Sequence, residues 1–183
     1  MEFPGVFLDQ LGPVRPFVLL EVGAARVTPF VDRALSSFVH EGLERAGQLG
    51  EFRDNRPLAV RCVHPTVTLL EKLDAISKRF ARVPMSPVSF VRHYEDAAAI
   101  IAKKDLPRLE GISVRQLADE MVVQKQIVAI PQPEDPSFGV SSAKKHEALR
   151  EAHGALSPRY WGPRRSLESS CTLIRSWLER HLA

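Results

Sequence analysis

HPTVTLLEKL, residues 64–73, is the stretch that decides how this chain folds. Proline suits the first turn of a helix, and the apolar residues that follow recur at steps of three and four, which predicts a helix with one buried face. That face carries Leu69, Leu73, Ile76 and Phe80. Lys72 lies on its flank, where a lysine can bury its stem against the core and still hold its ammonium at the edge of a cleft.

A second stretch, VRHYEDAAAI at residues 91–100, predicts another helix. Its inward positions are Val91, Tyr94, Ala98 and Ile101. Arg92 and Asp96 are one turn apart and fall on a different face from these residues. His93 and Tyr94 are expected to pack or to orient their neighbours. The two stretches together offer a cation and a carboxylate from neighbouring helices.

Around these helices the pattern predicts an α+β chain. Residues 1–86 form an α/β part, with strands expected at 17–22 and 58–63 and a short amphipathic helix at 33–48. Residues 87–183 form a helical domain, with Ser113 and Ser166 as helix caps. Its helices are expected at 88–104, 113–128, 142–156 and 166–181. Proline and glycine mark loops at 130–139 and 157–165.

The composition of the 183 residues is that of an ordinary globular chain, 44% hydrophobic and 26% charged. No apolar run approaches the ~20 residues of a membrane span, and the first residues do not resemble a signal peptide, so we expect a cytoplasmic protein without membrane contact. Cys62 and Cys171 lack metal-ligand spacing and are expected to be free, buried thiols.

The C-terminal quarter is basic. From Ser141 to Ala183 there are eight lysines and arginines against four glutamates, a net charge of +4 within a whole-chain charge of +3. This distribution fits a polyanionic partner such as RNA, and it also fits a solvated helical surface. The residues singled out as RNA-binding candidates are Lys144, Lys145, Arg159, Arg164 and Arg165.

The proline-led helix with Glu-Lys-Leu, the Arg-His-Tyr-x-Asp helix start and the earlier LLEVG at 19–23 occur in an order that resembles the AbiEii-type nucleotidyltransferase toxins of type IV toxin–antitoxin systems. The resemblance runs from about residue 5 to about residue 130. It implies that residues 1–86 are the trailing part of a nucleotidyltransferase-like α/β core. It also implies an enzyme that transfers a nucleoside monophosphate from an NTP to an RNA, such as a tRNA 3′ end, and that is neutralised by a cognate antitoxin protein.

The resemblance assigns roles to particular residues. Lys72 would contact the nucleotide's phosphates and Asp96 would complete the catalytic site. Glu21 would support Mg²⁺, while Arg92 and Lys125 would bind nucleotide or phosphate. Nucleotidyl transfer needs these residue types, because carboxylates hold the metal ion and a cation neutralises charge at the phosphate under attack.

One block of the family is missing. Nothing before Glu21 resembles the Gly-Ser loop and the Asp-x-Asp strand that hold the metal in such enzymes, and Asp9 stands alone. The chain is therefore a fragment or short form, or a relative that has lost the chemistry, and we expect little nucleotide transfer from it in isolation. The alternative function is a non-catalytic helical module that binds a protein partner or RNA.

Overall fold

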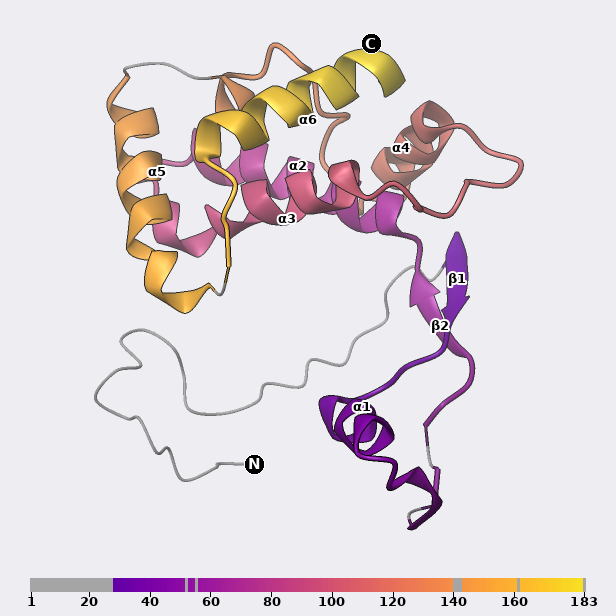
Figure 1. Ribbon diagram of the computed structural model, residues 1–183. Helices are drawn as coiled ribbons and strands as arrows, with labels where there is room; N and C mark the ends of the chain where they lie inside the picture. Colours follow the sequence, from indigo (N-terminus) through magenta and orange to yellow (C-terminus); the bar gives the residue numbers. More distant parts are fainter. Residues whose placement is uncertain (1–27, 52, 55, 140–142, 161, 183) are drawn as a thin grey trace.

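The computed structural model describes residues 28–51, 53–54, 56–139, 143–160 and 162–182 (Figure 1). Two short strands, β1 (Phe30–Arg33) and β2 (Val60–Val63), pair antiparallel with Phe30 opposite Val63. The connection between them contains α1 (Phe38–Arg45), which is shorter than the helix expected at 33–48. The strand expected at 17–22 lies outside the described residues. β1 was not predicted, because a strand of four residues is too short to show an alternating pattern, and its partner strand lies about 30 residues further along the chain.

The helical part begins directly after β2. It consists of α2 (Pro65–Ala81), α3 (Arg92–Ala102), α4 (Val114–Val123), α5 (Lys144–Ala155) and α6 (Leu167–His181). Each predicted helix is present, within a few residues of its expected bounds. Mixed α and β structure, mostly helical, is thus confirmed, and the finer expectation of a nucleotidyltransferase core stays a prediction.

Helix α2 supplies the centre of the core. The predicted stripe is buried along its whole length, with Leu69, Leu73 and Ile76 at most 1% exposed and Phe80 at 8%. α3 packs between α2 and α6, and Ile174 and Leu178 of α6 complete the same apolar cluster. Residues 65–81, which lie within the expected first domain at 1–86, therefore pack against the helices of the second.

Local sequence accounts for the helix ends. His64 caps α2 by accepting a hydrogen bond from the Thr66 amide at Nδ1. Its Nε2 then donates to the Pro107 carbonyl at 3.2 Å, which fastens the start of α2 to the segment before α4. Ser113 forms a capping box with Gln116 at the start of α4, and Ser166 caps α6, as the sequence predicted.

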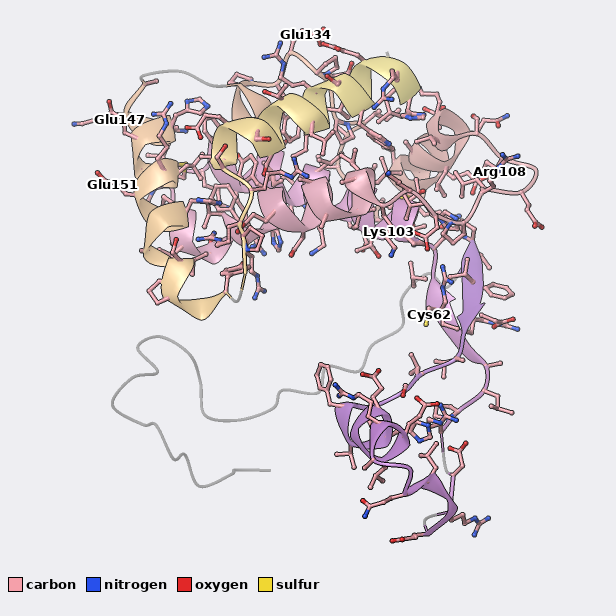
Figure 2. All side chains as sticks on the ribbon, viewed as in Figure 1. Cys62, Lys103, Arg108, Glu134, Glu147 and Glu151 are labelled. Atoms are coloured by element: carbon pink, nitrogen blue, oxygen red, sulfur yellow. The ribbon has the colours of Figure 1, made fainter. Side chains whose placement is uncertain are left out.

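The segment around α1 is built differently from the helical part. α1 contains no buried residue, and Phe38 is 90% exposed. Figures 1 and 2 show this segment apart from the helices, joined to them through the two-stranded sheet, whereas side chains crowd the space between α2, α3 and α6. The core that positions any site on α2 or α3 thus does not depend on α1.

Candidate functional site

The two residues singled out first in the sequence meet in space. Lys72 on α2 and Asp96 on α3 form a salt bridge, with Nζ donating to Oδ2 at 2.7 Å. The Lys72 side chain is 23% exposed and that of Asp96 42%, so the pair lies at the surface end of the α2–α3 contact. The apolar faces of α2 and α3 pack against each other, and this packing brings the two side chains together. The pair remains partly accessible to a ligand.

His93 lies beside this pair. Its Nδ1 is 3.7 Å from the same carboxylate oxygen of Asp96, and its ring is 13% exposed. His93 and then Lys72 lower the pKa of Asp96 to about 2, against the opposing effect of partial burial. Asp96 is therefore ionised throughout the physiological range.

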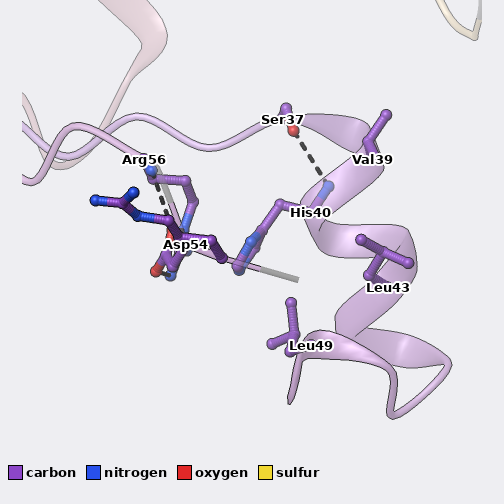
Figure 3. A pocket seen from close by; sticks show the side chains of 8 residues that line it. Ser37, Val39, His40, Leu43, Leu49, Asp54 and Arg56 are labelled. Atoms are coloured by element: carbon purple, nitrogen blue, oxygen red, sulfur yellow. Dashed lines mark hydrogen bonds and ion pairs between the residues drawn. The ribbon is translucent and has the colours of Figure 1, made fainter. Parts of the chain in front are cut away.

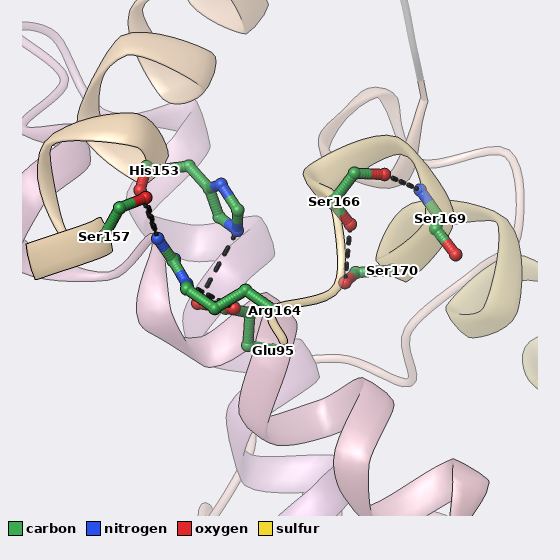
Figure 4. A network of polar contacts seen from close by, with 7 residues as sticks. All are labelled: Glu95, His153, Ser157, Arg164, Ser166, Ser169 and Ser170. Carbon is green, nitrogen blue, oxygen red and sulfur yellow. Dashed lines mark hydrogen bonds and ion pairs between the residues drawn. The ribbon is translucent and has the colours of Figure 1, made fainter. Parts of the chain in front are cut away.

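Glu95, the residue before Asp96 on α3, forms a shorter and more buried ion pair. Glu95 receives two hydrogen bonds from Arg164, Nε to Oε1 at 2.9 Å and Nη2 to Oε2 at 2.6 Å (Figure 4). Both side chains are only 12% exposed. Arg164 also donates through Nη1 to the His153 carbonyl and to Ser157 Oγ, and its guanidinium stacks 4.3 Å from the Tyr160 ring centre.

This arrangement corrects one expectation about Arg164. The Pro/Gly-flanked loop at 157–165 predicts a side chain with little packing, whereas Arg164 holds that loop onto α3 and α5 through three hydrogen bonds and makes a fourth to Ser157 within the loop. The physical reason is that the largely buried carboxylate of Glu95 needs a charged partner. Neither partner has a periodic signal in the sequence, since they are 69 residues apart.

An open cavity of about 580 Å³ adjoins this ion pair. Its lining includes Glu95, Ala99, Tyr160, Arg164, Arg165 and Ser166. The charges of Asp96 and Arg92 both influence the pKa of Tyr160, which burial raises. The cavity is thus within electrostatic reach of Asp96 and of the exposed Arg92.

The remaining predicted residues are dispersed. Lys125 follows α4 with a φ of 59° and is exposed; it occupies the left-handed position of a Schellman motif, in which its amide and that of Gln126 satisfy the last carbonyls of the helix. Lys145 donates to the Phe80 carbonyl at 2.7 Å and lies over the Phe80 ring. Lys144 and Arg165 are exposed. Glu21 and the side chain of Arg159 lie outside the described residues.

A second cavity, of about 410 Å³, lies in the α1 segment and was not anticipated (Figure 3). Val39, Leu43 and Leu49 give it apolar walls, and Asp54 and Arg56 form an exposed ion pair at one side. The apolar residues of the α1 segment are spaced as in any amphipathic helix, so the sequence carries no signal that would predict this cavity.

Within the described part of the chain, no group of three or more His, Cys, Asp or Glu side chains has the geometry to hold a metal ion. Among the described helices, none is long and apolar enough to cross a membrane. No family model, curated protein or solved structure matches the chain.

Proposed function

We propose that this chain is a nucleotidyltransferase-like protein of the AbiEii type, a class of enzyme that transfers a nucleoside monophosphate from an NTP to an RNA. The observation that carries the proposal is the 2.7 Å contact between Lys72 and Asp96. These two residues are 24 positions apart and come from different helices, and they are the pair that the resemblance assigns to one site.

Lys72 has the properties of a phosphate ligand. An ammonium carries three donors; one is directed to Asp96, and all three can serve phosphate oxygens when the ammonium turns toward them. Its stem is held by α2 and its head is partly exposed, which limits the rotamer entropy lost on binding. The exposed guanidinium of Arg92, one turn before Asp96, offers a second cation.

Asp96 would act as a carboxylate that supports the metal ion or the nucleophile. Its pKa of about 2 keeps it charged, which this role requires. The described residues supply no group of three that could hold Mg²⁺ by themselves, so we assign no step of the reaction to the ion. RNA would meet the exposed basic residues Lys144 and Arg165, because Lys145 and Arg164 already have partners within the fold.

Equilibrium binding of each NTP to the full chain tests the proposal. Lys72→Ala should weaken binding at least tenfold, which corresponds to about 1.4 kcal/mol, within the range of a charge-assisted hydrogen bond. Lys78→Ala is the matched control on the same helix, because Lys78 is 47% exposed and contacts only Asp74 as an ion pair in the described structure. Equal losses for both variants, or no NTP binding by the unmodified chain, would contradict the proposal.

Transfer is measured in parallel with labelled NTPs, Mg²⁺ and total tRNA. Because the Asp-x-Asp block is missing from the sequence, we expect weak or no labelling, even where binding is intact. Strong labelling that Lys72→Ala abolishes would show that other residues replace this block.

One observation favours a second candidate, a module that binds a protein partner. Phe38 and Val39 on α1 are 90% and 71% exposed, and apolar side chains in contact with solvent often mark an interaction surface. Sedimentation of the chain with and without Phe38→Asp tests one form of this candidate, association between copies. A loss of association in the variant, together with an absence of NTP binding, would favour this second function over transfer.

A further inference from the structure

Arg79 determines which ring nitrogen of His93 carries the proton. Arg79 Nη1 donates to the Ser89 carbonyl at 2.7 Å and lies 3.3 Å from His93 Nε2. An arginine cannot accept a hydrogen bond and stays charged in proteins, so Nε2 must be the acceptor. A neutral His93 then carries its hydrogen on Nδ1, which faces Asp96.

This Nδ1 is a donor without a partner. It is buried and makes no hydrogen bond to any described residue. The Asp96 Oδ2 atom is 3.7 Å away, too far for a hydrogen bond, and Lys72 donates to that same oxygen at 2.7 Å. A charged N–H···O contact has an optimum of roughly 2.7–2.9 Å, so a shift of about 1 Å would close the gap.

We propose that His93 is a positioning residue that takes over the Asp96 carboxylate when the Lys72 ammonium moves to a phosphate. The inference rests on the proposed function, in which Lys72 is a phosphate ligand. The Lys72 ammonium and the His93 Nδ1–H group, which both lie near Oδ2, then act in turn. Lys72 orients Asp96 before nucleotide binds, and His93 orients it afterwards.

The exchange of partners solves a specific problem. If Lys72 left Asp96 with no replacement, the half-buried carboxylate would lose its main hydrogen bond and would become free to rotate. A hydrogen bond from neutral His93 restores the orientation of the carboxylate. Because neutral His93 is uncharged, it does not compete with Lys72 while Lys72 is still paired with Asp96. Arg79 supports this role indirectly, because it fixes the tautomer.

The tautomer is tested directly in the unmodified chain. Two-dimensional ¹⁵N–¹H spectra of the histidine rings distinguish a protonated Nδ1 from a protonated Nε2, and we expect His93 to carry its hydrogen on Nδ1. In Arg79→Met the constraint is lost, and a mixture of both tautomers should appear. A single Nε2–H tautomer in the unmodified chain would overturn the inference without any mutation.

The exchange itself is tested with Lys72→Met, which removes the ammonium. The His93 Nδ1–H signal should move downfield as its hydrogen bond to Asp96 forms, and the pKa of Asp96, followed by ¹³C at its carboxyl carbon, should stay below 3.8. Asn and Gln at position 93 are matched replacements, because their amides mimic Nδ1 and Nε2 respectively. With Lys72→Met, His93→Asn should keep the low pKa and His93→Gln should raise it by about one unit.

Two results separate this inference from the proposed function. Identical Asp96 titrations for the Asn and Gln variants would overturn the role of His93. Inorganic triphosphate added to the unmodified chain should reproduce the downfield shift seen in Lys72→Met. If it does not, while Lys72→Met behaves as expected, phosphate binding by Lys72 is refuted and the partnership between His93 and Asp96 still stands.

Discussion

Removing the Arg164 side chain should destabilise the fold strongly. Arg164→Ala deletes both hydrogen bonds to Glu95 and those to the His153 carbonyl and Ser157 Oγ, and it leaves a carboxylate that is 12% exposed without its charged partner. Loss of one partner of a fully buried pair costs about 3–5 kcal/mol, and exposed pairs contribute ~0–1 kcal/mol. An open cavity adjoins this pair, so water can partly solvate the remaining carboxylate, and we expect a loss of unfolding free energy between these limits, about 2–4 kcal/mol.

The free energy of unfolding, obtained from urea titrations followed by circular dichroism, measures this loss. Arg165→Ala is the matched control, since the neighbouring arginine is exposed and makes one long side-chain contact among the described residues, 3.4 Å to Ser169 Oγ. It should change stability by less than about 0.5 kcal/mol. If the two variants are equally stable, the Glu95–Arg164 pair does not hold the 157–165 loop and the reasoning from burial fails.

Three further outcomes are expected. Because the folded pKa of Asp96 is about 2, below its ordinary 3.8, its contribution to stability is complete above about pH 4 and is lost as pH falls towards 2; Asp96→Asn should therefore flatten the dependence of unfolding free energy on pH in that window, and unchanged curves would count against the pairing. Lys125→Gly should stabilise the chain by about 1 kcal/mol in thermal or urea unfolding, because glycine adopts the left-handed conformation at φ 59° without strain, and destabilisation would show that the lysine side chain contributes. Cys62 is only half-buried, unlike the buried thiol expected from the sequence, so at pH 8 a thiol reagent should modify Cys62 of the folded chain and spare Cys171, whose pKa is raised to about 12 by burial; rapid modification of both would contradict the packing of α6.

Periodic signals carried most of the fold. The stripe of α2 and the inward face of α3 are readable because each buried position lies three or four residues from the next, and Ser113 and Ser166 are readable because caps act over three residues. The same local rules place Lys72 and Asp96 on the flanks of their helices. Their meeting follows once the two buried faces are packed against each other.

Contacts over long sequence separation were not readable. Glu95 with Arg164, Lys145 with Phe80 and the pairing of β1 with β2 each join segments that have no shared pattern. Charge counting assigned Lys145 and Arg164 to a free basic surface, because a sum over residues does not record which cations have a partner in the fold. The role of Arg79 toward His93 has the same character: it depends on the direction of one guanidinium.

Helix α2 has a consequence for how the candidate site responds to a ligand. Its apolar face lies at the centre of the core, so its amide protons should exchange with solvent only when the whole helical part unfolds, whereas those of α1, which contains no fully buried residue, should exchange through local opening. The backbone beneath Lys72 is therefore fixed on the timescale of binding. Any adjustment to an incoming anion has to come from rotation of side chains, over distances of an ångström or so, and a slow structural transition is not needed before the anion can enter.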